Sequence, residues 1–117
     1  MQCGASDALL LSIITVCRND AARLKLTTDS ISDFYGDARF EHIVVDGLSI
    51  DGTNSLAAML AQSTNFSFYS SRDSGIYDAM NRGVAYAKAP LLLFLNCGDT
   101  MLASPEELSA CLASLDR

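Results

Sequence analysis

The chain has 117 residues, 50% of them hydrophobic, and a formal net charge of -6 at pH 7. This length suits one domain with one core, and the apolar content excludes an intrinsically disordered chain. The acidic balance argues against a nucleic-acid partner and against docking on anionic lipid, because both require a basic surface. No apolar run is long enough to cross a bilayer and no basic segment precedes the first one, so we expect neither a membrane span nor a signal peptide.

Apolar periodicity predicts strands and helices that alternate along the chain. Residues 9–16 form a β-branched apolar run, typical of a strand buried on both faces. Further strands are expected over residues 42–46, 66–70 and 91–96, and the last of these is expected to be the most buried. Helices are expected from residue 19 or 20 to about 35, from 53 to about 63, from 76 to 88, and from 105 onward. This order predicts an α/β fold, a Rossmann-like and mainly parallel sheet with helices on both faces.

Local signals predict the ends and the inner faces of these helices. Asn19 or Asp20 is expected to cap the first helix, and Ser104 is expected to cap the last one just before Pro105. Helical spacing predicts the inward-facing residues, which are Leu24, Thr27 or Thr28, Ile31 and Phe34 in the first helix, Leu56, Met59 and Leu60 in the second, and Met80, Val84 and Ala87 in the third.

Acidic and amide side chains follow two of the expected strands. Asp46 ends the strand over residues 42–46, and Asn96 and Asp99 follow the strand over residues 91–96. Ligands bind at the carboxyl edge of open parallel sheets, so this placement indicates a nucleotide or metal site. Asn96 and Asp99 offer the hard oxygen ligands that Mg²⁺ or Mn²⁺ takes when substrate phosphates complete its shell. Two roles are open for Asp46: it accepts a hydrogen bond from a nucleobase or a ribose hydroxyl, or it forms hydrogen bonds within its own loop. Asp51 is expected to brace the loop and the start of the next helix.

The remaining polar residues allow narrower expectations. The loop after the first strand contains neither a dinucleotide fingerprint nor a P-loop, so a nucleotide would be held by strand ends and side chains. Arg18 there either faces a diphosphate or pairs with Asp20. Asp78 and Arg82 have the spacing of an exposed ion pair on a helix. His42 is the only histidine, so a zinc site or a Ser-His-Asp triad is disfavoured and a structural role is expected.

The spacing of the cysteines indicates the redox state of the thiols and the cellular compartment of the protein. Cys3, Cys17, Cys97 and Cys111 are widely spaced and form no C-x-x-C pair. Reduced, inert thiols in a cytoplasmic protein are the simplest interpretation. Cys17 and Cys97 both fall near strand ends, where they could meet in space.

Four segments in order resemble the family-2 inverting glycosyltransferases of the GT-A fold. Residues 11–20 are similar to the opening strand and loop of that family, and residues 43–53 to its V-D-G-G-S-T-D-G-T segment. Residues 73–83 and 94–99 resemble the D-x-G-I-Y-D-A-M-N-x-G and F-L-N-x-G-D segments of a bacterial subgroup that builds surface polysaccharides, of the colanic-acid type. The chain departs from the family where the usual D-x-D acids align with Asn96 and Gly98, which leaves Asp99 as the only carboxylate. Leu48 and Ile50 also replace the usual Gly and Thr.

The resemblance implies a nucleotide-sugar-binding half of a sugar transferase. It implies that one group of residues contacts the nucleotide sugar, namely Thr15, Val16, Cys17, Arg18, Asp46, Asp73 and Asn81. Within this group, Asp46 would contact the base and Asp73 would lie near the nucleoside. Asp99 and Asn96 would hold Mg²⁺ or Mn²⁺.

The same resemblance implies the partners and the location. The donor would be a UDP- or GDP-sugar, and a full-length protein would add a saccharide or lipid-linked acceptor. The catalytic base of the family lies after the metal motif, so we expect residues 1–117 to form one donor-binding domain without the acceptor half and without an assignable base. We expect a cytoplasmic protein, held at the inner face of the membrane through partners if at all, and exposed apolar surface would favour a homodimer. The alternatives are a non-catalytic nucleotide-binding or regulatory half-domain and, more remotely, a receiver-like or flavodoxin-like domain.

Overall fold

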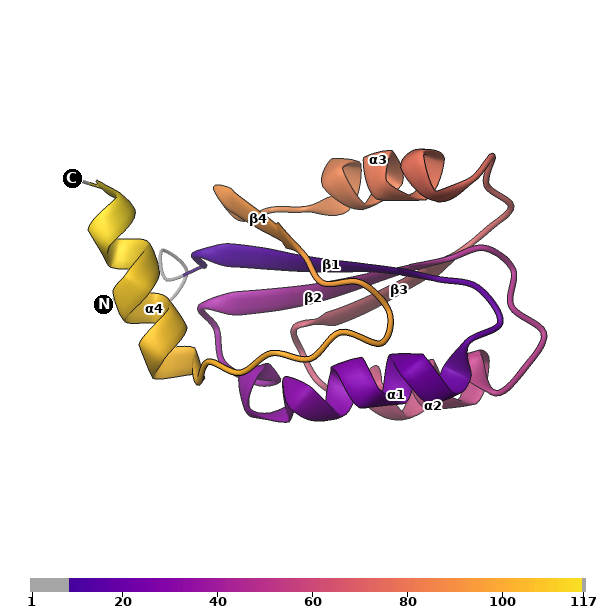
Figure 1. Ribbon diagram of the computed structural model, residues 1–117, viewed down its shortest axis with the longest axis horizontal. Helices are drawn as coiled ribbons and strands as arrows, with labels where there is room; N and C mark the ends of the chain where they lie inside the picture. Colours follow the sequence, from indigo (N-terminus) through magenta and orange to yellow (C-terminus); the bar gives the residue numbers. More distant parts are fainter. Residues whose placement is uncertain (1–8, 117) are drawn as a thin grey trace.

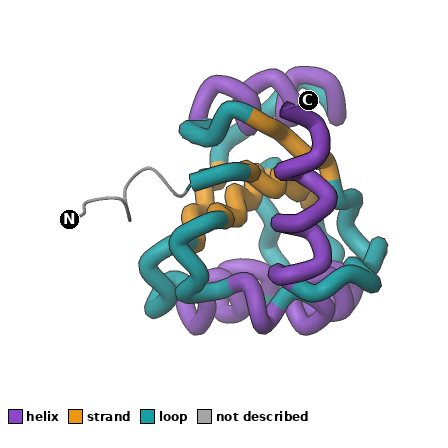
Figure 2. The backbone as a smooth tube through the Cα atoms, turned by 90° about the vertical axis from the view of Figure 1, so that its left-hand side faces the viewer, coloured by secondary structure: helices purple, strands orange, loops and turns teal. Residues whose placement is uncertain are grey.

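The computed structural model describes residues 9–116 as a parallel sheet flanked by helices. The sheet has the order β3-β2-β1-β4 and contains β1 (Leu11–Cys17), β2 (Phe40–Asp46), β3 (Phe66–Ser70) and β4 (Leu91–Phe94). The helices are α1 (Ala21–Ser30), α2 (Thr53–Leu60), α3 (Ile76–Tyr86) and α4 (Pro105–Ala113), with short 3₁₀ turns at Ser32–Phe34 and Ser114–Asp116. Helices α1 and α2 cover one face, α3 covers the other, and α4 lies beyond the amino ends of the strands (Figures 1 and 2). The predicted α/β fold class is confirmed.

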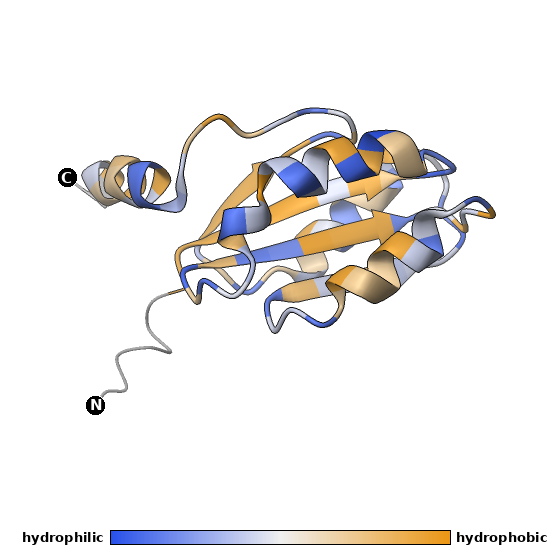
Figure 3. Cartoon of the chain, turned by 90° about the horizontal axis from the view of Figure 1, so that it is seen from below, coloured by the Kyte–Doolittle hydropathy of each residue, from blue (hydrophilic) through white to orange (hydrophobic). Residues whose placement is uncertain are grey.

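The core is centred on β1 and β2, the two inner strands. Successive residues of β1 face opposite layers: Ile13 packs with Phe34 on the α1 side, whereas Ile14 lies against α3. Ile13, Ile14 and Val44 are at most 1% exposed. The hydropathy colouring in Figure 3 follows this pattern, with apolar residues concentrated along the strands.

Strand β4 departs from the expectation that it is the most buried. Leu92 and Phe94 are 40% and 37% exposed, because β4 pairs only with β1 and forms one edge of the sheet within the described residues. An apolar run indicates a strand but does not reveal where that strand lies in the sheet order, so this prediction was wrong.

Helix α1 is shorter than predicted and is capped differently. It ends at Ser30, and the chain continues as a 3₁₀ turn that still buries Ile31 and Phe34 as expected. Neither Asn19 nor Asp20 caps the helix with its side chain. The backbone N–H of Ala21 instead donates to Asp51 Oδ2 at 3.0 Å, so the cap comes from the loop that follows β2.

The inner faces of α2 and α3 also differ from the prediction. Met59 and Val84, both expected to face inward, are 70% and 43% exposed. Helix α3 packs through Ala79 and Gly83 instead, and a Cβ at position 83 would lie 2.5 Å from Ile14 Cγ2. Small residues let the helix approach the sheet closely, whereas the predicted inner face of α3 did not include Ala79 or Gly83.

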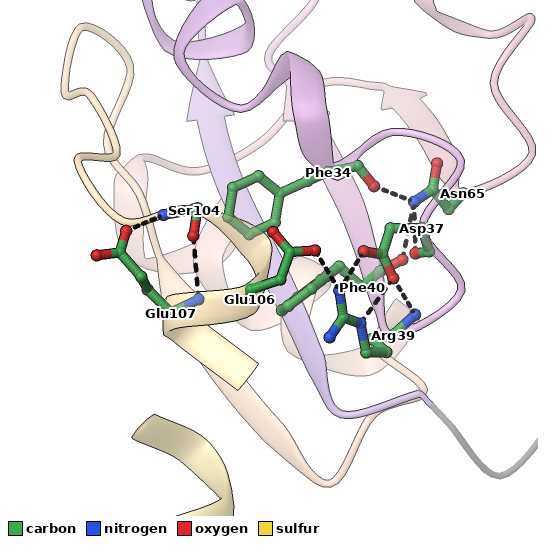
Figure 4. A network of polar contacts seen from close by, with 8 residues as sticks. All are labelled: Phe34, Asp37, Arg39, Phe40, Asn65, Ser104, Glu106 and Glu107. Carbon is green, nitrogen blue, oxygen red and sulfur yellow. Dashed lines mark hydrogen bonds and ion pairs between the residues drawn. The ribbon is translucent and has the colours of Figure 1, made fainter. Parts of the chain in front are cut away.

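A polar cluster holds the end of the sheet from which the strands begin (Figure 4). Asn65 Nδ2 lies within 2.8, 3.2 and 2.9 Å of the carbonyl oxygens of Phe34, Asp37 and Phe40. One side-chain amide therefore fixes the turn that leads from the 3₁₀ segment into β2.

Helix α4 is joined to this same end by its first turn. Ser104 accepts from the Glu107 N–H and Glu107 accepts from the Ser104 N–H, so the predicted cap is present as a full capping box. Arg39 pairs with Asp37 at 2.7 Å and with Glu106 at 3.2 Å (Figure 4). The hydrogen bonds from Arg39 hold the pKa of Asp37 below its usual value. Within residues 9–116 no helix has the length and apolar character that a bilayer span requires.

Candidate functional site

Two adjoining hollows open at the carboxyl edge of the sheet. The first has a volume of about 330 Å³ and is lined by Val16, Cys17, Arg18, Asp20, Asp73, Gly75, Ile76 and Cys97. The second has a volume of about 350 Å³ and is lined by Arg18, Gly47, Leu48, Arg72 and Asp73. Arg18 and Asp73 belong to both, so together the hollows form one cleft divided by these two side chains. The carboxyl edge of the sheet, where a ligand site was predicted, therefore contains a cleft.

Four of the predicted contact residues line this cleft: Val16, Cys17, Arg18 and Asp73. Arg18 is exposed, and no carboxylate among the described residues lies within ion-pair distance of its guanidinium. Asp20 pairs instead with Arg23 at 3.8 Å. Of the two roles considered for Arg18, pairing with Asp20 is absent, and Arg18 lines both hollows.

Asp73 lies over the backbone of the β2–α2 loop. Its Oδ1 accepts from the Gly75 N–H at 3.1 Å, and a Cβ at Gly47 would lie 2.8 Å from its Oδ2. Gly47 therefore permits the close approach of the Asp73 carboxylate. A glycine directly after a strand-end Asp is a sequence signal for such a close approach, because it carries no Cβ.

Thr15 does not line the cleft. Its side chain is fully buried on the opposite face of the strand from Val16, and Thr15 Oγ1 lies 2.8 Å from His42 Nε2. His42 Nδ1 lies 2.8 Å from Tyr35 Oη, so both ring nitrogens are hydrogen-bonded. Burial lowers the pKa of His42 from 6.5 to about 3, which keeps the ring neutral. His42 is structural, as expected.

Asp46 is fully buried and lines neither hollow. Oδ2 accepts from the Ser49 N–H at 2.8 Å and from Ser70 Oγ at 2.7 Å, whereas Oδ1 accepts from Ser49 Oγ and from Cys17 Sγ, the latter at 3.4 Å. In this conformation the carboxylate ties the ends of β1, β2 and β3 together, which is the loop-bonding role considered for it. A contact between Asp46 and a nucleobase stays a prediction and would require these partners to rearrange.

The charge of Asp46 also affects the neighbouring thiol. Burial first, and then the Asp46 carboxylate, raise the pKa of Cys17 well above its usual value. Burial likewise raises the pKa of Cys97, to about 11, and Cys17 and Cys97 pack in one cluster beside the cleft. Both thiols are free and protonated at neutral pH, as expected; Cys3 lies outside the described residues.

The loops that follow β1 and β2 are hydrogen-bonded to each other. The Asn19 N–H donates to Ser49 Oγ at 2.7 Å, and the Ile50 N–H donates to Asn19 Oδ1 at 2.7 Å. Asp51 accepts from Ala21 as described above and from the N–H and hydroxyl of Thr53 at 3.0 and 2.5 Å. The hydrogen bond from the Thr53 hydroxyl is the main cause that lowers the pKa of Asp51. Asp51 thus braces the loop and the start of α2, as predicted.

The candidate metal ligands follow β4 on an exposed loop. Asn96 and Asp99 are both exposed, and Cys97 between them lines the first hollow. No three His, Cys, Asp or Glu side chains gather into a metal cluster in the described part of the chain. One carboxylate and one amide oxygen still suit Mg²⁺ or Mn²⁺ where phosphate oxygens supply further ligands, so the donor chemistry fits an ion completed by substrate.

The position of this loop depends on α1, which the sequence analysis did not anticipate. Thr27 is fully buried, and its hydroxyl accepts from the Gly98 N–H at 2.8 Å and donates to the Asp99 carbonyl oxygen at 2.8 Å. A buried Thr at a core position of a helix was predicted only to pack. The prediction placed Asn81 at the site, but Asn81 is exposed on α3 and lines neither hollow.

Comparison with known proteins identifies the family. Residues 12–117 match the family described as Glycosyl transferase family 2. The chain belongs to this family. An uncharacterized glycosyltransferase of Mycobacterium tuberculosis (strain CDC 1551 / Oshkosh) is 34% identical over 111 residues, covering 94% of this chain and 41% of that protein. A PGL/p-HBAD biosynthesis glycosyltransferase of Mycobacterium bovis (strain BCG / Pasteur) is 41% identical over 97 residues, covering 80% of this chain and 37% of that protein.

Solved glycosyltransferases share the fold. S. aureus TarS, solved as residues 1–349 and also in complex with UDP-GlcNAc, superimposes with a TM-score of 0.78 at 21% identity, covering 92% of this chain and 31% of that chain in the complex. The mannosyltransferase PcManGT from Pyrobaculum calidifontis, in complex with GDP-Man and Mn²⁺, gives a TM-score of 0.73 at 20% identity over 87% of this chain and 31% of that chain. The sheet is thus that of GT-A glycosyltransferases, and the family-2 chain spans 41% of the length of its Mycobacterium tuberculosis relative.

Proposed function

We propose that residues 9–116 form the donor-binding half of a family-2 inverting glycosyltransferase that takes a nucleotide-diphosphate sugar for polysaccharide synthesis. The observation that supports this most directly is the cleft at the carboxyl edge of the sheet, lined by Val16, Cys17, Arg18 and Asp73. The structural neighbours solved with UDP-GlcNAc and with GDP-Man support the same ligand class. The relative named as a PGL/p-HBAD biosynthesis glycosyltransferase supports a role in sugar transfer within a biosynthetic pathway.

In this proposal, the two hollows receive different parts of the donor. The first, with Val16 and Cys17 on its wall, suits the base and ribose because it combines apolar contacts with polar edges. Arg18 lines both hollows, and no carboxylate among residues 9–116 lies within ion-pair distance of it, so its guanidinium would be free to donate two parallel hydrogen bonds to a diphosphate. The Asp73 carboxylate is left to accept from a ribose or sugar hydroxyl.

A divalent ion is part of the proposal. Asp99 and Asn96 would hold Mg²⁺ or Mn²⁺ together with phosphate oxygens, and the ion would supply charge neutralisation for the leaving diphosphate. Arg18 would share that neutralisation from the side of the β1 loop. An ion bound mainly through the diphosphate would bind weakly without nucleotide.

We assign no catalytic base. A base must lie within hydrogen-bond reach of the acceptor hydroxyl, and its help is typically worth about 10²–10⁴-fold. Asp46 is buried with four donors, and Asp73 is proposed to face the donor. The acceptor, saccharide or lipid-linked, and the base are therefore proposed to belong to the part of a longer transferase that corresponds to the remaining length of the relatives.

The test is nucleotide binding with and without metal. UDP and GDP are titrated into the 117-residue protein by calorimetry, each with Mn²⁺ and with EDTA, and one of them should bind more tightly with Mn²⁺. Arg18→Ala should weaken the diphosphate at least tenfold and the matching nucleoside by less than twofold. Lys25→Ala is the matched control, because Lys25 is an exposed cation paired with Asp29 on α1, and it should change neither affinity.

Asp99→Ala should abolish the increase in nucleotide affinity that Mn²⁺ causes, and it should leave the nucleotide affinity in EDTA unchanged. Absence of binding by either nucleotide at millimolar concentration would contradict the proposal. Multiple-turnover transfer of sugar to a saccharide acceptor by these 117 residues would show that the chain already carries a base, and that the half-site assignment is wrong. Metal-independent binding without any transfer would favour the non-catalytic nucleotide-binding alternative.

A further inference from the structure

The loop from Asn96 to Asp99 converges on a single side chain from another element. The Thr27 hydroxyl on α1 accepts from the Gly98 N–H at 2.8 Å, and it lies 2.8 Å from the Asp99 carbonyl oxygen and 3.3 Å from that of Asn96. The hydroxyl has one proton and two lone pairs, so it can satisfy all three backbone groups, with the proton shared between the two carbonyl oxygens. Three of the four backbone units in this loop thus depend on one buried group.

The loop has a defined turn shape that this contact preserves. The Asp99 N–H donates to the Asn96 carbonyl oxygen at 2.9 Å, and Gly98 has φ of +101°. A positive φ at the third residue of such a turn is the type II geometry, which favours glycine. The side chain of Arg23 covers this glycine, since a Cβ at position 98 would lie 3.2 Å from Arg23 Cδ.

A second hydroxyl on α1 continues the attachment. Ser30 Oγ accepts from the Met101 N–H at 3.0 Å and donates to the Thr27 carbonyl oxygen at 2.7 Å. At the other end, Cys97 Sγ donates to the Asp20 carbonyl oxygen at 3.6 Å. The chain after β4 therefore contacts α1 and the residue before it at successive points. Figure 1 shows the course of this segment back along α1.

We propose that Thr27 is a positioning residue, which sets where Asp99 and Asn96 stand relative to the cleft. This inference rests on the proposed function, because it concerns the residues that would meet the ion and the diphosphate. Asp99 and Asn96 are exposed, and no hydrogen bond to either side chain is found among the described residues, so their own contacts do not fix them. The backbone that carries them is fixed by Thr27. A change at Thr27 should therefore act on the metal-dependent part of binding and spare the part that depends on Val16, Cys17 and Arg18.

The neighbouring residue offers a matched control. Thr28 is also buried on α1, but its hydroxyl donates only to the Lys25 carbonyl oxygen within the helix. Thr27→Val and Thr28→Val remove the same hydroxyl from the same helix and keep a side chain of nearly the same shape. Thr27→Ser restores the hydroxyl. Any general effect of valine in α1 appears in both valine variants, whereas an effect on the loop appears only in Thr27→Val.

The first measurement is amide hydrogen exchange without any ligand. Thr27→Val should accelerate exchange of the Gly98 amide at least tenfold, with a smaller increase at Met101, whereas Thr28→Val and Thr27→Ser should match the wild type. Equal Gly98 exchange in the two valine variants would overturn the inference, whatever the nucleotide results show.

The second measurement is the Mn²⁺ affinity of the protein saturated with UDP or GDP, followed by the electron paramagnetic resonance signal of free Mn²⁺. Thr27→Val should weaken Mn²⁺ at least tenfold and change nucleotide affinity in EDTA by less than twofold. If the nucleotide-saturated wild type does not bind Mn²⁺, the metal part of the proposed function is wrong, and the positioning role of Thr27 is wrong as well. If the wild type and Thr27→Val bind Mn²⁺ with equal affinity, only the positioning role is wrong. If Thr27→Val does not fold, the same measurements are made on Ser30→Ala, for which we expect a smaller change in amide exchange and Mn²⁺ affinity in the same direction.

Discussion

Acidification should destabilise the fold through the only histidine in the chain. His42 is fully buried between Tyr35 and Thr15, and its pKa lies at about 3 in the folded state, compared with 6.5 when exposed. Between these two pH values the His42 imidazole is protonated in the unfolded chain and neutral in the folded chain. The free energy of unfolding therefore decreases as the pH decreases. The contribution is complete above pH 6.5 and is lost progressively below it. At about 1.36 kcal/mol per pH unit, the loss is about 2 kcal/mol by pH 5.

The assay is urea unfolding at pH 7, 6 and 5 for the wild type and for His42→Gln, which cannot titrate in this range. The wild type should lose about 2 kcal/mol between pH 6.5 and pH 5, whereas the variant should show a much flatter profile. Most carboxylates titrate below this window, so the difference between the two proteins isolates the imidazole. Since the chain has one histidine, its ring signals can be followed directly by NMR. A native imidazole that titrates near pH 6.5, or equal slopes in the two proteins, would refute the reasoning.

Two further substitutions test the packing and the electrostatics of the sheet edge. Gly83→Ala should lower the free energy of unfolding by about 1–3 kcal/mol, because the new Cβ would lie 2.5 Å from Ile14 Cγ2 in a packed layer; an unchanged urea midpoint would contradict the close approach of α3. Asp46→Asn removes a charge that raises the Cys17 pKa, so Cys17 should be alkylated faster at pH 9, as measured by mass spectrometry of its peptide, while the rate at exposed Cys111 serves as the control. Equal Cys17 rates in wild type and variant would show that burial alone sets that pKa.

The sequence was sufficient for the class of fold and for the edge that carries the cleft. Alternation of apolar strands with amphipathic segments predicts a parallel sheet, and polar residues after strands predict where ligands bind. It was not sufficient for strand order, because the apolar run in β4 has the same composition at an edge as at the centre. The exposure of Leu92 and Phe94 follows from pairing on one side only, which is a property of the assembled sheet.

The residues of the candidate site, like the features of the fold, could be predicted from the sequence only in part. Val16, Cys17, Arg18 and Asp73 could be predicted because they follow or end strands and belong to recognisable segments. Thr15 shares its face of β1 with Cys17 but lies one pair of residues further from the end of the strand, where its hydroxyl contacts His42 and not the cleft. The role of Thr27 could not be predicted, because it joins segments about 70 residues apart in the chain, and a threonine among core positions of a helix gives no local sign of a distant partner.

The mutual hydrogen bonds between the loops after β1 and β2 have a consequence for how the cleft behaves before a ligand arrives. Asn19 and Ser49 each supply a bond to the other loop, and Asp51 holds the first turn of α1. Neither loop can move away alone without leaving donors of the other unpaired, so the two should open as one cooperative unit. A ligand entering between them would find a wall that is already ordered, and it would lose less of its binding free energy to immobilising the chain. Substitutions in the two loops should for the same reason be non-additive, with Asn19→Ala and Ser49→Ala together costing less than the sum of each alone.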